Sequence, residues 1–281
     1  MKKIATLLLT LLIGLSLFAQ GQVSTRKHRL ADFTDKMTQV VLTGDEVLNA
    51  ALRKEIPYIW TSSTFEFCSL EQFEKLKTQD KYYFLIPVES VFKGEEEPGI
   101  RFLTLVKGGS DAKDGISAMH EVVSLPVAAA MGTTDRDLVY LGGIIQAIQE
   151  YTLAAMESES AAYKMSEWFN GRFKKSIDGK KVYIAEEDLS SEVTGKALAK
   201  LENNLSLHIV PSSESDWQYV HQSDDTVVGY VIAPIFPVKG SVCYKLLFEA
   251  DTHRLCYLER HKIGDKKSEG FLASDLKPLG K

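Results

Sequence analysis

Hydrophobic positions in the first half of the chain switch between helical and strand-like spacing. Residues 44–56 place apolar side chains three and four positions apart, which predicts an amphipathic helix that ends at Pro57. Residues 58–68 are rich in aromatic and β-branched side chains and predict a strand. Residues 69–76 open with Ser-x-x-Gln, the pattern of a capped helix. The near-continuous apolar run over residues 82–89 then predicts a central strand that is covered on both faces.

The same order of elements returns about 145 residues later. It comprises a helix over residues 190–203, a strand over 205–210, a short helix from Ser213 and an apolar strand over 226–234. Each half then finishes with two further strands, which are residues 99–107 and 121–127 in the first half and 242–250 and 255–263 in the second. The repeated order predicts an α/β (α+β) fold of two similar tandem domains, each a mixed β-sheet with helices. Two unrelated segments that share a common element order are the alternative.

A long helix is expected between the two halves, over residues 136–157, where no proline interrupts the pattern. Its expected buried face consists of Leu141, Ile144, Ile145, Ile148, Thr152, Ala155 and Met156. Gly142 and Gly143 each weaken this helix by about 1 kcal/mol relative to alanine. Their small size would let another helix or a strand approach closely.

The domain boundaries follow from these elements. The first α/β domain is expected over residues 36–158 and the second over residues 180–281, joined by a polar linker over residues 159–179. Residues 20–35 are expected to be disordered or extended, because their first half is polar and basic.

The first 19 residues have the layout of a secretory signal peptide. Lys2 and Lys3 precede an uncharged apolar run, and the small residue Ala19 precedes a polar stretch. The run is shorter than the roughly 20 apolar residues that a transmembrane helix needs. The sequence therefore predicts cleavage, no integral membrane segment after it, and a soluble periplasmic or secreted protein. No cysteine lies near the expected cleavage site to carry a lipid anchor.

Composition and charge narrow the class of protein. With 44% hydrophobic and 25% charged residues, the chain matches an ordinary folded globular protein. Loss of Lys2 and Lys3 with the leader would change the formal charge from −5 to −7. An acidic protein without a concentrated basic face is not expected to bind nucleic acid. The best basic cluster, around Arg172 to Lys181, is interrupted by Asp178.

Three cysteines, Cys68, Cys243 and Cys256, are too few for a disulfide framework in a chain of this size. In a hairpin that turns at Asp251 and Thr252, Cys256 would face Leu247, about 13 Å along the strand from Cys243. That separation exceeds the Cα distance of about 7 Å that a disulfide allows. We therefore expect buried free thiols.

The sequence offers little that indicates catalysis. Gly-x-Ser-x-Gly, His-Glu-x-x-His, Cys-x-x-Cys and the phosphate-binding Gly-x-x-x-x-Gly-Lys-Ser/Thr pattern are all missing, so no cofactor and no metal are expected. Asp251 and His253, in the turn Ala-Asp-Thr-His-Arg, are the weak catalytic candidates, because the pair could act as a general base or bind a metal. Both residue types also suit a polar turn for purely local reasons.

At residues 58–89 and 181–190 the sequence resembles those of exported proteins of uncharacterised function that are common in Bacteroides-type bacteria. The resemblance covers most of the chain after the leader and implies a Gram-negative periplasm. It carries over no activity, ligand or functional residue.

Three functions remain open at this point. The first is a non-enzymatic periplasmic protein that binds a protein or another envelope partner through its paired domains. The second is a binder of a small ligand or a glycan in the cleft between the domains. The third is a hydrolase with an unrecognised site, centred on Asp251 and His253. The partner surface itself is not visible in the sequence.

Overall fold

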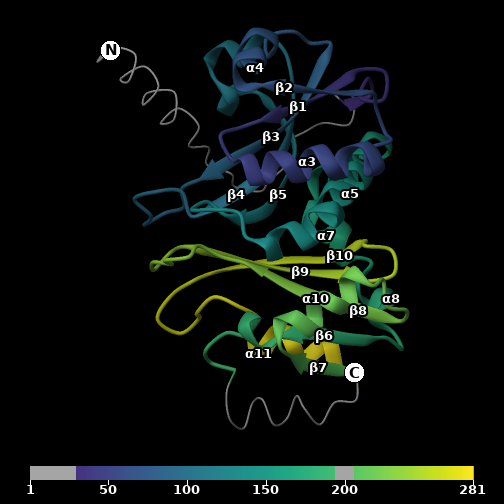
Figure 1. Cartoon of the computed structure of the whole chain (residues 1–281), viewed down its shortest axis with the longest axis vertical. Helices are drawn as coiled ribbons and strands as arrows, with labels where there is room; N and C mark the ends of the chain where they lie inside the picture. The colour runs from purple at the N-terminus through teal and green to yellow at the C-terminus, as the bar shows by residue number, and fades with distance from the viewer. Residues whose placement is uncertain (1–29, 194–205, 281) are drawn as a thin grey trace.

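The computed structural model describes residues 30–193 and 206–280 of the chain. The expected signal peptide, residues 1–19, lies outside them, as does most of the helix expected over residues 190–203. Two lobes of similar construction are stacked along the long axis of the molecule (Figure 1).

The first lobe is built on a five-stranded mixed sheet with the strand order β2-β1-β3-β4-β5. Its strands are β1 (Met37–Leu42), β2 (Phe65–Ser69), β3 (Tyr82–Ser90), β4 (Ile100–Lys107) and β5 (His120–Ala129). Strand β1 pairs in parallel with both β2 and β3, whereas β4 runs antiparallel to β3 and β5. The two short 3₁₀ turns between β4 and β5 are Ser110–Asp114 and Ile116–Ala118.

Helices cover both faces of this sheet. Helix α3 (Glu46–Ile59) and the long helix α5 (Asp135–Glu157) contribute to the hydrophobic cluster on one face. Helix α4 (Leu70–Leu76) packs Phe73 into a smaller cluster on the other face. The capping box expected at its start is confirmed, because Ser69 Oγ accepts from Gln72 N at 3.2 Å and Gln72 Oε1 accepts from Ser69 N at 2.8 Å.

Helix α3 does not end at Pro57, as the sequence predicted. The helix continues through Pro57 to Ile59, so Tyr58 and Ile59 are helical rather than part of the following strand. The ring of Pro57 obstructs only the carbonyl one turn earlier, that of Arg53. Both residues are exposed in the last turns, and Trp60 N still donates to Ile56 O at 2.9 Å. A proline in this position therefore costs the helix little.

The second lobe repeats the sheet with the order β7-β6-β8-β9-β10 and the same strand directions. Its strands are β6 (Lys181–Ala185), β7 (Leu207–Val210), β8 (Thr226–Ile232), β9 (Val242–Glu249) and β10 (Leu255–Lys262). Helix α10 (Ser212–Val220) takes the place of α4, and the chain ends with α11 (Ala273–Leu276) and a 3₁₀ turn (Lys277–Gly280). The expected α/β fold with two similar sheet domains is therefore confirmed.

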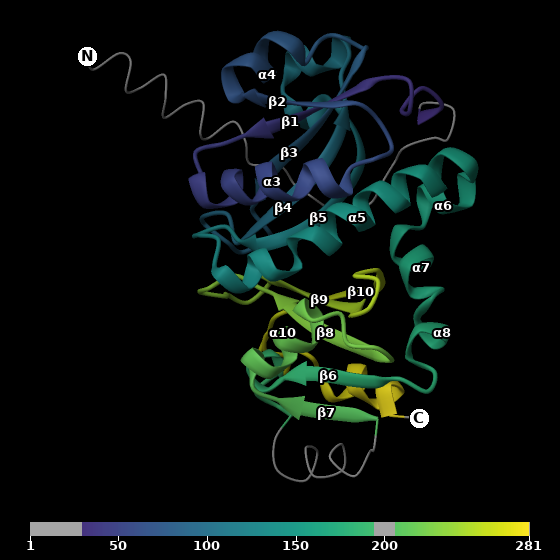
Figure 2. The same ribbon diagram turned by 45° about the vertical axis from the view of Figure 1, so that its right-hand side comes forward.

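Two segments expected to be loosely structured are packed. The linker expected over residues 159–179 contains three short helices, α6 (Glu159–Tyr163), α7 (Met165–Asn170) and α8 (Phe173–Ile177), seen on one side in Figure 2. Phe169 of α7 is fully buried. At the other end, Leu30 and Phe33 are also fully buried, so the extended segment expected over residues 20–35 does not reach its last residues. In both segments, apolar residues within a mainly polar stretch of sequence, Phe169 in the first and Leu30 and Phe33 in the second, are packed into the core.

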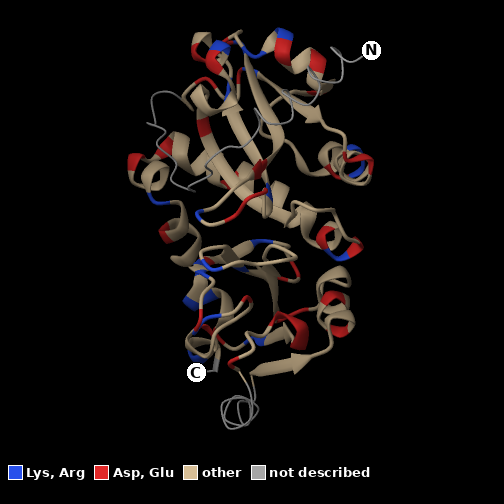
Figure 3. Ribbon diagram, turned by 90° about the vertical axis from the view of Figure 1, so that its left-hand side faces the viewer, with Lys and Arg blue, Asp and Glu red and all other residues tan. Residues whose placement is uncertain are grey.

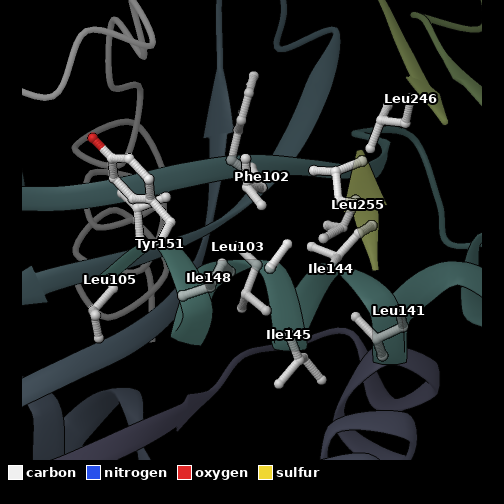
Figure 4. Packing of buried hydrophobic residues seen from close by; sticks show 14 of the residues in the cluster. Phe102, Leu103, Leu105, Leu141, Ile144, Ile145, Ile148, Tyr151, Leu246 and Leu255 are labelled. Carbon is white, nitrogen blue, oxygen red and sulfur yellow. The ribbon is translucent and has the colours of Figure 1, made fainter. Parts of the chain in front are cut away.

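Helix α5 lies between the two sheets and is buried on more than one face. The predicted face is buried as expected from Leu141 to Ala155, whereas Met156 is only half-buried. Tyr140 and Tyr151 are buried as well. Figure 4 shows Ile144 of α5 next to Leu255 of the second sheet and Ile148 next to Leu103 of the first. These residues belong to one cluster, so the similar lobes share a continuous core rather than enclosing an open cleft along their whole contact.

The three cysteines are buried and free, as expected. Cys256 lies at a bulge of the β9–β10 hairpin, where its Sγ is 3.3 Å from Leu247 O. Within residues 30–193 and 206–280, none of the helices combines the length and apolarity that a membrane crossing requires.

Asp32 ties the beginning of the described chain to the first sheet, which leads to a pH-dependent prediction. Its carboxylate accepts hydrogen bonds from Tyr83 Oη at 2.7 Å and from Lys107 Nζ at 2.7 and 2.8 Å, and pairs with Lys36 at 2.8 Å. Burial alone would raise the pKa of Asp32, but Lys107, Lys36 and Tyr83 outweigh it and lower the pKa to about 2.

We expect Asp32→Asn to destabilise the protein by about 1 kcal/mol at pH 7, a modest value because the pair is partly solvated. A carboxyl group with a lowered folded-state pKa stabilises above its ordinary value near 4 and stops doing so as the pH falls towards 2. The difference between wild type and variant in urea unfolding should therefore shrink from pH 5 to pH 2.5. A difference that stays constant over this range would contradict the assignment.

Candidate functional site

The carboxyl ends of the parallel strands in the first sheet surround an open hollow of about 410 Å³. Strands β1 and β3 are neighbours, but β1 leads to β2 on one side and β3 leads to β4 on the other. Such a reversal is where ligands bind in open α/β sheets. The hollow, which we call the strand-end hollow, is lined by Thr43, Gly44, Asp45, Leu70, Pro87, Glu89, Arg101, Ala130, Met131 and Gly132.

Local sequence explains how the floor of this hollow forms. Asp45 is the N-cap of α3, and its Oδ1 accepts from Leu48 N at 3.0 Å, which satisfies one of the free amides of the first turn. A Cβ built on Gly44 or Gly132 would meet no atom within 4 Å, so both backbone segments border open space. The hollow is thus framed by main chain at two points.

Arg101, the second residue of β4, connects the segments that form the floor of the hollow. Its Nη1 donates to Asp45 Oδ2 and to Thr133 Oγ1 (2.9 Å), and its Nη2 donates to Glu89 Oε1 (2.8 Å) and Ala130 O (3.1 Å). Burial alone would raise the pKa of Asp45, but the Leu48 amide, Thr133 and Arg101 outweigh it and lower the pKa. Both terminal nitrogens of the guanidinium are already engaged with the protein.

The charge that remains towards solvent is negative. Asp45 and Glu89 carry two negative charges against one on Arg101, and the Glu89 side chain is 41% exposed whereas that of Arg101 is 10% exposed. The strand-end hollow therefore presents a carboxylate, not a guanidinium, to an incoming ligand. Its chemistry favours an ammonium or guanidinium group over an anion.

A second hollow of about 300 Å³ lies beside the first, at the junction of the lobes. We call it the interdomain hollow. Its lining comes from the β3–β4, β5–α5 and β8–β9 connections, and consists of Glu95, Glu96, Glu97, Pro98, Gly99, Met131, Pro234, Ile235, Phe236 and Val238. Met131 lines both hollows, so they form one continuous surface, which we call the Met131 surface.

Backbone contacts between the two connections fix the shape of the interdomain hollow. Gly94 and Gly240 both have a positive φ, of 98° and 107°, and a Cβ on either would lie within 3 Å of the other connection's backbone. A Cβ on Gly99 would lie 2.7 Å from Pro234 Cγ. Both connections project to the same side of the molecule at the junction (Figure 1), and this side, with its acidic and basic segments, faces the viewer in Figure 3.

Large apolar side chains are exposed around this hollow. Phe236 is 74% exposed and Met131 64% exposed, and Ile235 and Val238 are exposed as well. Pro234 and Pro237 bracket Ile235 and Phe236 and have no amide hydrogen, so this segment cannot extend the ladder of β8. Single exposed apolar residues are ordinary, but four around one hollow make it a candidate interaction surface.

The equivalent strand ends in the second lobe are closed. Asp188, like Asp45, follows the end of the first strand of its sheet by three residues. It accepts two hydrogen bonds from Arg136 of α5, at 2.7 and 2.8 Å, and Arg136 also pairs with Asp216 at 3.1 Å. Tyr140, one helical turn later, donates to Asp216 Oδ1 at 2.7 Å and stacks on Tyr230 with ring centroids 4.2 Å apart.

Electrostatics support a structural role for this closed end. Burial alone would lower the pKa of Arg136, but Asp188 and Asp216 outweigh it and the pKa is raised. Burial raises the pKa of Asp188 to about 6, and the two bonds from Arg136 hold the carboxylate ionised at neutral pH. Of the two equivalent strand ends, only the first therefore remains open to a ligand within the described residues.

Asp251 and His253, the candidates from the sequence, lie at the tip of the β9–β10 hairpin and line neither hollow. Asp251 is exposed. His253 Nε2 is 3.0 Å from Tyr219 O, and the two rings stack with centroids 4.3 Å apart. Through these contacts His253 packs the hairpin tip against α10, so its role in the described structure is structural.

The residues that form the Met131 surface were not singled out in the sequence. Two features of the sequence could have pointed to them: an arginine within the otherwise apolar strand sequence Ile-Arg-Phe-Leu, and two apolar residues between prolines in Pro-Ile-Phe-Pro. A charge in a strand needs a partner, and apolar residues in a proline-bracketed loop have no ladder to join. Neither signal identifies the other members, which come from distant parts of the chain.

Comparison with family models, with curated proteins and with solved structures gives no match for this chain. Across residues 30–193 and 206–280, no cluster of three or more histidine, cysteine, aspartate or glutamate residues has a geometry that could hold a metal ion.

Proposed function

We propose that this protein is a non-enzymatic, exported protein of the periplasm that binds a protein partner of the cell envelope through the Met131 surface. The observation that carries the proposal is the group of four exposed apolar side chains, Met131, Ile235, Phe236 and Val238, around a hollow with rigid walls. Burial of such side chains by a partner is favourable by roughly 25 cal/mol per Å² of apolar area.

Rigidity supports binding over a packing role within the chain. The glycine-mediated contacts between the two connections hold the hollow in shape before any partner arrives, which lowers the ordering cost of association. The rim carries Glu96 and Glu97, both exposed, which gives an apolar centre with a polar edge. Protein interfaces have this arrangement.

A small ligand or a glycan is the alternative occupant. The strand-end hollow, at about 410 Å³, is large enough for one. Ligand binding there would raise the melting temperature in a screen of envelope sugars, peptides and amines. A ligand that binds equally to wild type and to Phe236→Glu would favour this alternative over a protein partner.

The test compares two charge insertions at exposed aromatic residues. Phe236→Glu disrupts the Met131 surface, and Tyr58→Glu, at an 83% exposed position on α3, serves as the matched control. We expect an immobilised wild-type protein and the Tyr58 variant to retain the same partner from envelope extract, and Phe236→Glu to retain at least tenfold less. Both variants should melt like wild type, because neither side chain is buried.

Equal retention by all three proteins would overturn the proposal. The protein itself should be recovered from the periplasmic fraction of the cells that make it, and its recovery in the cytosolic fraction with residues 1–19 still present would contradict export.

A further inference from the structure

The equivalent strand ends of the two sheets are lined by different residues, and the difference indicates which ligand chemistry the open one favours. In the second lobe, Arg136 and Tyr140 of α5 occupy the end of the sheet, with the guanidinium on Asp188 and the ring on Tyr230. They are four residues apart on one face of a helix. A cation and a large apolar group at this spacing thus satisfy one copy of the site from within the chain.

The first lobe has the same topology and leaves the corresponding place open. Both of its carboxylates, Asp45 and Glu89, accept from Arg101, but the Glu89 side chain is still 41% exposed and lines the hollow. Leu70, Pro87 and Met131 supply apolar lining beside it. The open copy therefore still offers a carboxylate next to an apolar wall.

The combined Met131 surface carries a strong excess of negative charge. Five carboxylates line the two hollows, those of Asp45, Glu89, Glu95, Glu96 and Glu97, against the single guanidinium of Arg101. Glu95 is engaged locally, because its Oε2 accepts from Phe92 N at 2.7 Å. Glu89, Glu96 and Glu97 remain partly or fully exposed and surround the apolar side chains.

We propose that the partner docks on the Met131 surface through a basic amphipathic helix that carries an arginine or lysine and a large apolar side chain four residues apart. The cation binds at Glu89 in the strand-end hollow, and the apolar side chain packs against Met131 and Phe236 in the interdomain hollow. The inference rests on the proposed function and adds the chemistry of the partner: the acidic lining favours a cation, and the exposed Met131 and Phe236 favour an apolar group beside it. Arg136 and Tyr140 show that a helix can present such a pair four residues apart at a strand end of this fold.

The probe for the test is a fluorescein-labelled helical peptide on an alanine and glutamine background, with one arginine and one phenylalanine four residues apart. Two control peptides replace the arginine by glutamine or the phenylalanine by alanine. The protein variant is Glu89→Gln with Glu96→Gln and Glu97→Gln, since glutamine at position 89 keeps an oxygen that can accept from Arg101. The matched control removes three exposed carboxylates at the far end of α5 and beyond it, by Glu157→Gln, Glu159→Gln and Glu167→Gln.

We expect saturable binding of the probe in fluorescence anisotropy, at least tenfold weaker binding of either control peptide, and at least tenfold weaker binding of the probe to the Glu89 triple variant. The control variant should bind the probe within twofold of wild type. Binding should also weaken as the salt concentration rises from 0.05 to 0.5 M, an interval over which screening shortens from about 14 to about 4 Å.

Three outcomes with the peptides overturn the inference: no saturable binding, equal binding of probe and control peptides, or equal loss in both triple variants. A wild-type dimer in sedimentation that Phe236→Glu dissociates also overturns it, because the surface would then be occupied by a second copy of the chain. Each of the three peptide results can occur while Phe236→Glu still loses the envelope partner, so failure of the peptide chemistry is distinguishable from failure of the proposed function.

Discussion

Substitution of Arg136 by methionine is expected to destabilise the protein by about 3 to 5 kcal/mol. The guanidinium makes two hydrogen bonds to Asp188, pairs with Asp216 and lies over the ring of Tyr230 at 5.3 Å. Its removal leaves the Asp188 carboxylate, only 4% exposed, without its charged partner. Chemical denaturation of both proteins at pH 7.5 measures the difference directly.

The pH dependence of that defect separates a lost ion pair from lost packing. Burial already raises the pKa of Asp188 to about 6, and without Arg136 it should rise further. A carboxyl group with a raised folded-state pKa is tolerated at low pH and penalises the fold as the pH rises through that pKa. The defect of Arg136→Met should therefore be smaller at pH 5 than at pH 8.

Two controls accompany this experiment. Arg136→Met combined with Asp188→Asn removes the unpaired buried charge, and should recover part of the stability that the single variant loses. Arg254→Met removes an arginine whose side chain is 46% exposed and pairs with Glu150, and should cost less than about 1 kcal/mol. If Arg136→Met were within 1 kcal/mol of wild type in its free energy of unfolding, the Arg136–Asp188 pair would not be an important stabilising interaction between the lobes.

Alanine at Gly143 is expected to destabilise the protein by about 2 kcal/mol, whereas alanine at Gly142 should leave it unchanged or stabilise it by up to about 1 kcal/mol. A Cβ at Gly143 would lie 2.4 Å from Tyr219 Oη and 2.9 Å from His253 O. The second contact is with backbone, which cannot rotate away. The β9–β10 hairpin and α10 would have to move.

Gly142 supplies the matched control from the next residue of the same helix. A Cβ there would lie 3.1 Å from Ile59 Cδ1, the far end of a side chain that can adjust. Both substitutions gain about the same helix propensity relative to glycine, so their difference isolates the packing cost. Thermal unfolding of the two variants side by side gives this difference, and equal melting temperatures would contradict the close approach at Gly143.

The sequence predicted the repeated order of elements because spacing and caps are local properties. The Ser69–Gln72 capping box and the buried face of α5 follow from residues a few positions apart, and both are confirmed. The first strand of each sheet was missed. Strand β1 is central, yet it contains Thr38 and Gln39, whose side chains are satisfied by Ser63 and Glu66 from other segments. Polar residues in a central strand become intelligible only when those partners are known.

The candidate site depends even more on distant partners. Asp45 is recognisable from the sequence as the start of a helix, but its pairing with Arg101 requires a sheet in which only β3 separates β4 from β1. Met131 and Phe236 belong to different lobes and line one hollow at a junction where the turns at Gly94 and Gly240 pack closely together. Asp251 and His253 were suggested as a pair because they are close in sequence, but the side chain of His253 contacts Tyr219 O.

Hydrophobic period and capping act within a few residues, so the sequence alone predicts most of the helices and strands, their order and the similarity of the two halves, but neither the first strand of each sheet nor the helices α6 to α8. The tertiary structure decided which of the two equivalent strand ends is closed and which is open. That choice depends on where α5 lies: its first turns place Arg136 and Tyr140 over the second sheet, where Asp188 and Tyr230 receive them. The first sheet satisfies Asp45 with its own Arg101, so its hollow and the exposed apolar residues beside it remain open to solvent.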